Sequence, residues 1–366
     1  MDISSLIKDA VSYINSYEER KRKIAHALAP LKGQELKTET SAELLESQFV
    51  FPVIPAELNF RCAGVDSGFM GKRLSSADIV LVRAAGVVFD YEKGKLAKAQ
   101  YHPNFFSFPT PHLSNNALED DEYACSMGLI RLREEVNVAR EILQKYKPRY
   151  LFLDGSIVPQ YADKPRSDSV VRNLYHEILQ NFQSLYSEAE AKGCTLIACV
   201  EDSRGKRINE LLRNEINRDE TYISNKTLNG MFDWAILDYL LEVGERTMAF
   251  SYSGSIKKHP ILADMPGWRE HIYGLYLRPA QYDRPLRIEF LCRGKGDEIA
   301  ARANEAAGAA LALSSMHREY AYPAVLIEAD LKAHLKQDEI EIVFGKIFDK
   351  LGKDTRLKLR RESRPF

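Results

Sequence analysis

The sequence has few of the residues that build a disulfide framework or a zinc ribbon, and no segment that suits a membrane span. It has five cysteines in 366 residues, and no two of them form a CxxC pair, which excludes the first two classes and indicates reduced thiols. No apolar run approaches the roughly 18 residues that cross a bilayer, and the chain does not open with a basic and then apolar signal segment. We therefore expect a soluble, cytoplasmic protein without a membrane partner.

The chain also lacks an excess of charge of either sign, and it lacks a P-loop. Lysine and arginine number 51, and aspartate and glutamate 52, so any nucleic-acid surface must be local. Without a GxxxxGK[ST] segment, ATP-driven motion has to come from a partner. With 45% hydrophobic and 28% charged residues, the composition is that of a folded protein, and the length suits one large domain or two modest ones.

The hydrophobic pattern predicts a mixed α/β protein. Three strands with short connections come first and favour an antiparallel meander, whereas the next apolar strands alternate with helices, as parallel buried strands do. The expected strands are 61–65, 79–89, 97–101, 150–153, 195–200, 272–277 and 286–291, and the expected helices are 3–30, 123–145, 169–192, 234–241, 298–313 and 337–350. This order predicts a ribonuclease H-like mixed sheet flanked by helices, with helical N-terminal and C-terminal additions, rather than a doubly wound dinucleotide fold.

Two predicted strands end in an aspartate among small residues. Asp66 lies in the segment GVDSG and Asp154 in the segment LDGS. Ligands collect where the strands of an α/β sheet end, and we expect these two strands to be neighbours. Because two close carboxylates repel each other unless a cation lies between them, the pair indicates a Mg²⁺ or Mn²⁺ site.

A third acid comes from the predicted helix 123–145. Glu135 shares its apolar stripe with Ala139 and Ile142, and an acid in such a place needs a partner. Glu134 lies further round the helix, where solvent accounts for it. Glu135 is therefore the better candidate for a metal ligand.

Four segments together resemble the motifs of the NurA family of nucleases: AGVDSG (63–68), RLREE (131–135), LFLDGS (151–156) and YPAVLIEAD (322–330). The resemblance spans about residues 60 to 335. It implies a ribonuclease H-like core that cleaves DNA with Mn²⁺ or Mg²⁺, as a 5′→3′ exonuclease and single-strand endonuclease. It also implies a homodimer that works with a hexameric HerA-type ATPase in DNA end resection, double-strand break repair and homologous recombination.

The resemblance also implies the catalytic residues, in a site with two metal ions. Asp66, Glu135 and Asp154 match the family's metal-binding acids, with Asp66 between the two ions, and Tyr322 matches its tyrosine. Asp330 stands where the family often has a histidine; it can still bind a hard cation, but it cannot act as a neutral base. His334, four residues later, is a possible substitute.

Under this resemblance the chain divides into three segments. Residues 1–55 are an N-terminal helical segment, residues 56–345 the NurA ribonuclease H-like nuclease domain, and residues 346–366 a basic C-terminal tail that either meets phosphate or keeps the chain soluble. The amphipathic N-terminal helix is the candidate surface for docking on the ATPase ring.

Two further groups leave alternatives open. Arg204, Lys206 and Arg207 follow a buried strand and either hold substrate phosphates or belong to an ordinary charged loop. The Pro- and Asn-rich residues 103–122 look like a surface loop that includes several aromatic residues. For this aromatic cluster we expect packing or a dimer contact rather than the stacking of bases.

Two other functions use related features. An actin-like or sugar-kinase-like ATP-binding protein also has aspartates at strand ends, but it needs a duplicated domain, and only one set of strands precedes residue 201. A catalytically silent DNA-binding scaffold subunit of a helicase complex fits the altered last motif. The three retained acids favour the nuclease.

Overall fold

The computed structural model describes residues 3–36, 41–74, 77–114, 118–314 and 318–351. The chain forms two compact units, each built from segments that are far apart in the sequence. The first unit comprises Met1–Ala56, Cys199–Ile256 and Glu270–Pro323, and the second comprises Glu57–Ala198, Lys257–Arg269 and Ala324–Phe366. The three-segment division predicted from the sequence stays a prediction, and most of its basic tail, residues 352–366, lies outside the described residues.

The second unit contains the predicted meander. Its strands are β2 (Arg61–Arg73), β3 (Asp78–Glu92), β4 (Lys95–His102), β5 (Thr110–Ser114), β6 (Tyr150–Asp154) and β7 (Thr195–Val200), of which the last two residues, Cys199 and Val200, belong to the first unit. They follow the order β7-β6-β2-β3-β4, with β5 also paired to β3. The β2–β3 and β3–β4 pairs are antiparallel, and the β2–β6 pair is parallel, which confirms a mixed sheet.

Two sequence predictions about these strands are wrong. Residues 103–122 are not all loop, because β5 lies within them as a short strand that carries Pro111, a residue tolerated at sheet edges. The strand around Asp66 does not end there either: β2 stays paired with β3 as far as Arg73, opposite Asp78. Only its pairing with β6 stops, at Val65. The small residues in the motif therefore mark the end of the neighbouring strand, not of β2 itself.

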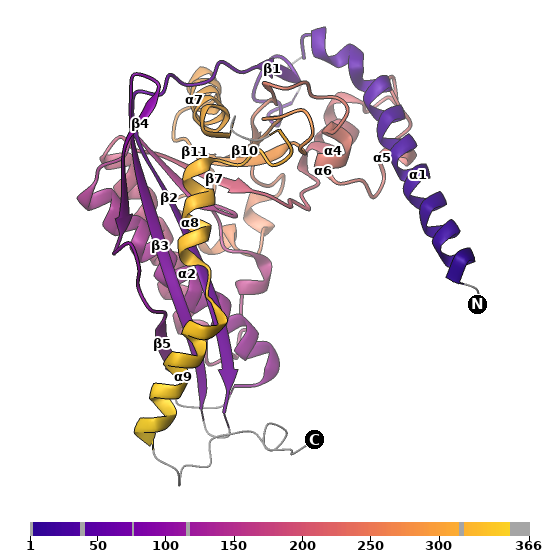
Figure 1. Cartoon of the computed structure of the whole chain (residues 1–366). Helices are drawn as coiled ribbons and strands as arrows, with labels where there is room; N and C mark the ends of the chain where they lie inside the picture. The colour runs from indigo at the N-terminus through magenta and orange to yellow at the C-terminus, as the bar shows by residue number, and fades with distance from the viewer. Residues whose placement is uncertain (1–2, 37–40, 75–76, 115–117, 315–317, 352–366) are drawn as a thin grey trace. The chain divides into compact units, whose positions relative to one another are not determined.

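Helices cover both faces of this sheet. They are α2 (Asp120–Lys145), α3 (Arg172–Ala191), α8 (Ala324–Ala333) and α9 (Gln337–Leu351), with short helical turns at η3 (Tyr161–Asp163), η5 (Ile256–Lys258, where the chain enters the unit) and η6 (Leu262–Asp264). Both α2 and α8 pack on β2 and β3, and Figure 1 shows α8 running along these strands. Successive residues of a strand face opposite sides. Ser67 of β2 bonds to α2, whereas Gly64 and Gly68 lie against α8, so the two helices lie on opposite faces.

The described part of the first unit contains five further strands and several helices. Its strands are β1 (Val50–Pro52), β8 (Glu245–Thr247), β9 (Phe250–Ser251), β10 (Ile272–Leu277) and β11 (Leu286–Leu291). Its helices are α1 (Ile3–Leu28), η1 (Ala29–Gly33), α4 (Arg207–Leu211), η4 (Leu212–Ile216), α5 (Asn225–Leu228), α6 (Asp233–Leu237) and α7 (Asp297–Ser314). Neighbouring strands follow the order β1-β8-β10-β11, and β9 pairs with β10. The two longest of these strands, β10 and β11, match the predicted ranges 272–277 and 286–291.

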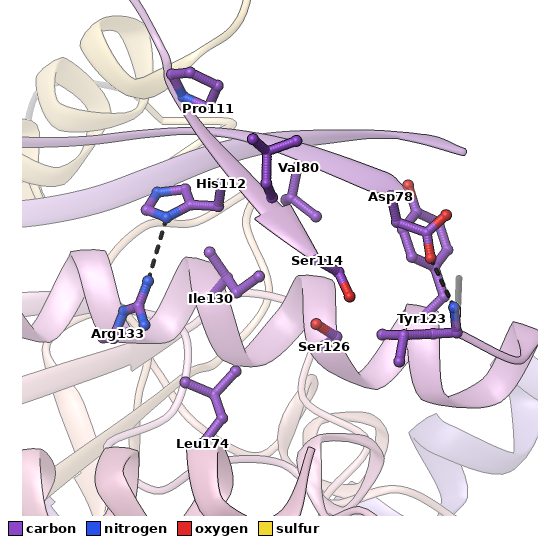
Figure 2. A pocket seen from close by; sticks show the side chains of 12 residues that line it. Asp78, Val80, Pro111, His112, Ser114, Tyr123, Ser126, Ile130, Arg133 and Leu174 are labelled. Carbon is purple, nitrogen blue, oxygen red and sulfur yellow. Dashed lines mark hydrogen bonds between the residues drawn. The ribbon is translucent and has the colours of Figure 1, made fainter. Parts of the chain in front are cut away.

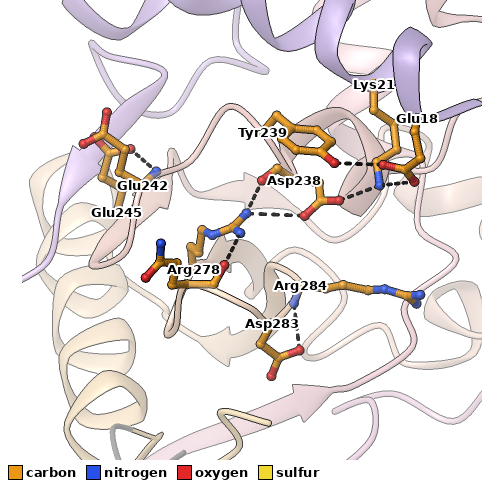
Figure 3. A network of polar contacts seen from close by, with 10 residues as sticks. Glu18, Lys21, Asp238, Tyr239, Glu242, Glu245, Arg278, Asp283 and Arg284 are labelled. Carbon is orange, nitrogen blue, oxygen red and sulfur yellow. Dashed lines mark hydrogen bonds and ion pairs between the residues drawn. The ribbon is translucent and has the colours of Figure 1, made fainter. Parts of the chain in front are cut away.

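Buried ion pairs hold the first unit together. Lys21 of α1 lies 2.8 Å from Glu18 and 2.6 Å from Asp238, which also accepts hydrogen bonds from Arg278 (Figure 3). These contacts attach the C-terminal half of α1 to the segment that follows α6. Among the described residues no helix combines the length and the apolar character that a membrane crossing needs.

A candidate carboxylate site

The two aspartates of the strand motifs lie side by side. β2 and β6 run parallel with Val65 opposite Leu153, so Asp66 and Asp154 are the next residues on neighbouring strands. The prediction that these strands are adjacent is confirmed. Asp66 is buried and Asp154 is partly exposed, so the pair reaches from the sheet toward solvent.

The glycines on either side of Asp66 let α8 lie directly on β2. A Cβ atom at Gly64 would come within 2.6 Å of the Val325 carbonyl oxygen, and one at Gly68 would meet the carbonyl oxygen of Ala333. Neither glycine has an unusual backbone conformation, so the requirement is the close approach itself. Because α8 lies this close, its residue Asp330 is brought near Asp66.

Glu135 reaches the same region from α2 on the other face of the sheet. Its side chain is buried, as predicted. Ser67 donates a hydrogen bond to Glu135 Oε2 at 2.5 Å, and Arg131 Nη1 donates another at 2.8 Å. Burial raises the pKa of Glu135, and the nearby charge of Asp154 adds to this, while Arg131 and Ser67 oppose it. The carboxylate therefore has the partner that its buried position demands.

We call Asp66, Glu135, Asp154 and Asp330 the carboxylate cluster. The pKa of Asp66 is raised to about 8, first by burial and then by the charges of Asp154, Glu135 and Asp330. A carboxyl group in such surroundings resists ionisation unless a positive charge is added. The structure thus brings together the four acids that the sequence selected as metal ligands.

The cluster suits a divalent cation in the chemistry of its donors. Carboxylate oxygens are the preferred ligands of Mg²⁺ and Mn²⁺, and a bound cation would offset the repulsion among the acids that helps to raise the pKa of Asp66. As the side chains stand, however, no three acidic, histidine or cysteine residues in the described ranges have a metal-binding arrangement. Glu135 is instead engaged by Arg131.

Two other predicted residues, Tyr322 and His334, have surroundings of their own. Tyr322 belongs to the first unit, where it is buried and donates a hydrogen bond to the Cys199 carbonyl oxygen at 2.9 Å. His334 is exposed just beyond α8. Their catalytic roles stay predictions.

The three basic residues predicted to hold phosphate differ in their surroundings. Arg204 and Lys206 are exposed, whereas Arg207 is buried and bonded to Glu43 and Glu210. Burial lowers the pKa of Arg207. The two exposed residues are therefore the ones whose charge is available to a ligand.

Sequence reasoning gave no role to several residues around Glu135. Ser67 and Arg131 bond to it directly. Asp163 raises the pKa of Glu135 through its charge, and its own pKa is raised by burial. Ser67 and Arg131 stood inside the quoted motifs, which is the signal that could have found them, whereas nothing in the sequence marks Asp163.

A separate cavity of about 420 Å³ lies between β3, β5 and α2 (Figure 2). It is polar on several sides: Asp78 Oδ1, His112 Nε2 and Tyr123 Oη have no hydrogen-bond partner among the described residues. Arg133 donates to His112 Nδ1 at 3.2 Å, and burial lowers the pKa of His112. No member of the carboxylate cluster lines this cavity.

Comparisons with known proteins identify the family and the fold. A family model described as NurA domain matches residues 60–335, the span of the resemblance seen in the sequence. The NurA nuclease from Sulfolobus solfataricus superposes with a TM-score of 0.60 at 14% identity, over 97% of this chain and 99% of that chain. No curated protein matches the sequence.

Two further structural matches have lower TM-scores. A NurA bound to dAMP and manganese has a TM-score of 0.44 at 10% identity, over 81% of this chain and 90% of that one. An endonuclease V from Bacillus subtilis has a TM-score of 0.37 at 12% identity, over 81% and 86%. The predicted mixed α/β nuclease fold is confirmed by the mixed sheet and by the superposition on the Sulfolobus solfataricus NurA at a TM-score of 0.60.

Proposed function

This chain belongs to the NurA family of nucleases, and from that premise we propose that it hydrolyses phosphodiester bonds of DNA at the carboxylate cluster. The observation that carries the proposal is the adjacency of Asp66 and Asp154 at the ends of the paired segments of β2 and β6, with Glu135 of α2 bonded to Ser67 beside them. Acids far apart in the sequence converge on one buried carboxylate, and such perturbed groups gather at functional sites.

In this proposal the residues of the cluster hold one or two divalent cations, Mn²⁺ or Mg²⁺. Asp66 and Asp154 would be ligands from the sheet, Glu135 from α2 and Asp330 from α8. A bound cation supplies Lewis-acid activation of a water molecule and neutralises charge on the phosphate. Ser67 and Arg131 both donate hydrogen bonds to the Glu135 carboxylate and orient it. The backbone of α8 lies against β2 beside Asp66 and keeps solvent from that side.

Other parts of the proposal concern the substrate. Arg204 and Lys206 would contact its phosphates, with Arg207 held by Glu43 as a positioning residue. Tyr322 stays in the proposed catalytic set on the strength of the family motif. We propose cleavage of single- and double-stranded DNA, as a 5′→3′ exonuclease and a single-strand endonuclease.

The proposed partner is a hexameric HerA-type ATPase, with a homodimer of this chain acting with it in cytoplasmic DNA end resection and break repair. The N-terminal half of α1 supports a docking role. Its apolar side chains recur at helical spacing and are exposed: Ile3, Leu6, Ile7, Val11 and Ile14. Exposed apolar stripes of this kind mark interaction surfaces.

The function is tested by cleavage of end-labelled single- and double-stranded DNA with Mn²⁺, Mg²⁺ or EDTA. We expect cleavage with the metals, none with EDTA, and a loss of at least 100-fold, on the order of a lost catalytic group, in Asp66→Asn. Glu134→Gln is the matched control, because Glu134 lies on the same helix as Glu135 but pairs with Arg133 instead. Intact DNA under all metals, with and without the ATPase, would favour the silent scaffold.

The docking surface is tested separately by Ile7→Asp combined with Val11→Asp. Deletion of the whole helix is avoided because Lys21 and Ile24 are buried in the first unit. We expect loss of ATPase binding in a pull-down and unchanged metal-dependent cleavage of single strands. Retained binding would exclude this half of α1 as the docking surface.

A further inference from the structure

The loop between β4 and β5, residues 103–109, presents three phenylalanines to solvent. Phe105 is 65% exposed, Phe106 54% and Phe108 49%. Of the two alternatives expected for this cluster, interior packing is therefore wrong for these three rings, whereas a dimer contact stays a prediction. An exposed aromatic ring does not contribute the large hydrophobic free energy that its burial would give. A group of such rings on one loop therefore marks a binding surface. We call residues 103–109 the aromatic loop.

The rings of this loop are held in defined orientations. Phe105 meets Tyr101 edge to face, with centroids 4.8 Å apart, and Phe106 meets Phe108 in the same way at 5.3 Å. Arg83 Nη1 of β3 donates a hydrogen bond to the Ser107 carbonyl oxygen at 2.9 Å. The loop is thus fastened to the sheet, and its exposed rings are pre-oriented for a ligand.

Cationic side chains lie directly beside these rings. Lys332 Nζ is 3.8 Å from the centroid of Phe105, and Lys346 Nζ is 5.8 Å from that of Phe108. Lys332 is on α8, two residues after Asp330 of the carboxylate cluster. The aromatic loop is therefore next to the helix that contributes an acid to the proposed active site.

We propose that the aromatic loop is a stacking platform for single-stranded DNA, with unpaired bases on Phe105 and Phe106 and phosphates near Lys332 and Lys346. Alternating rings and cations match the alternating bases and phosphates of a single strand. A duplex keeps its base faces stacked inside, so the platform selects unpaired nucleotides. The inference rests on the proposed nuclease function, and it names the part of the substrate that the second unit binds.

The test is the affinity for a fluorescently labelled oligothymidine, measured by anisotropy in EDTA so that no cleavage occurs. Phe105→Ala and Phe106→Ala should each weaken binding by on the order of tenfold, and Phe→Tyr at the same positions should restore it. An abasic strand of equal length removes the bases from the ligand. Wild type and both alanine variants should bind that strand equally.

The charges are tested through the salt dependence of the same affinity. Lys332→Ala and Lys346→Ala should each lower the slope of log affinity against log salt by about 0.7, the value for one phosphate contact on a single strand. Tyr161→Ala is the control, because Tyr161 is another exposed ring of the second unit. It should leave both the affinity and the slope unchanged.

Unchanged oligothymidine affinity in the two phenylalanine variants would overturn the proposal. A change of oligomeric state in those variants, with unchanged DNA affinity, would instead identify the loop as a protein contact. The nuclease function is checked independently by hydrolysis of bis(p-nitrophenyl) phosphate with Mn²⁺ by the wild type and by Asp66→Asn. This diester carries no nucleobase, so its result does not depend on the platform.

Discussion

The Glu135 carboxylate is held by Arg131, whose Nη1 atom lies 2.8 Å from Glu135 Oε2 one turn earlier on α2. The same arginine reaches Ser67 Oγ at 3.3 Å. The acid on the second face of the sheet is thus neutralised by a cation of the protein itself. Any metal ion that uses Glu135 has to compete with this guanidinium.

We expect Arg131→Gln to bind Mn²⁺ roughly tenfold more tightly than the wild type, because a repelling positive charge is removed and Glu135 is released. Isothermal titration calorimetry measures the change. Arg133→Gln is the control, since Arg133 pairs with Glu134 at 3.2 Å rather than with Glu135. Weaker binding in Arg131→Gln would mean that the arginine orients Glu135 for the metal.

The stability of the metal-free protein should depend on Asp66. Its folded-state pKa is raised from 3.8 to about 8, so the folded state binds a proton more tightly than the unfolded state does. Stability is therefore lost as the pH rises from about 4 to about 8. Asp66→Asn lacks this penalty and should melt at a higher temperature than the wild type at pH 8 in EDTA, with the difference shrinking toward pH 4. Equal melting temperatures at both pH values would contradict the coupling.

The glycines beside Asp66 should resist substitution. Gly64→Ala places a methyl group against the Val325 carbonyl and Gly68→Ala against that of Ala333, so α8 has to shift at a cost of roughly 1–3 kcal/mol. Urea denaturation measures the loss. In Gly345→Ala the new methyl group meets nothing within 4 Å on helix α9, and the change should stabilise by about 0.5–1 kcal/mol. If Gly64→Ala and Gly68→Ala were both as stable as the wild type, α8 would not lie in close contact with β2.

The buried pair of Arg246 and Glu46 should matter more than any surface pair. Arg246 is fully buried and makes two hydrogen bonds to the Glu46 carboxylate, at 2.7 and 2.8 Å. Removing one partner leaves the other charge buried and unpaired, so Arg246→Met should cost about 3–5 kcal/mol of unfolding free energy. Arg218→Met, at an exposed pair with Glu215, should cost less than about 1 kcal/mol. Comparable losses of unfolding free energy in Arg246→Met and Arg218→Met would contradict the prediction that the buried pair contributes more than the exposed one.

Much of the order of helices and strands along the chain was predictable, because it depends on local patterns of apolar residues. The apolar runs 272–277 and 286–291 correspond to β10 and β11 with the same bounds. The amphipathic pattern at the N-terminus predicted α1 within two residues of its end. Helix α8 was missed, because its ten residues were interpreted as a motif and not as an element.

The candidate site was predictable only in part. The adjacency of Asp66 and Asp154 followed from two apolar runs that each lead into an acid. The apolar stripe of the predicted helix selected Glu135, and the family motif selected Asp330. The partners of Glu135 did not follow, because Ser67 and Arg131 reach it across the packing of β2 on α2. A sequence pattern reports which side chains are buried, not which ones meet.

By itself the sequence determined the family, the order of the main strands and helices along the chain, and the choice of the four acids as candidates, since hydrophobic periodicity and short motifs encode burial and chemistry locally. Tertiary structure alone decided that β2 continues past Asp66 along β3, that α8 lies on the glycines of β2, and that the aromatic loop is exposed. Each of these depends on contacts between segments far apart in the chain. Such contacts depend on how the side chains of distant segments pack together, and a local sequence pattern does not contain that information.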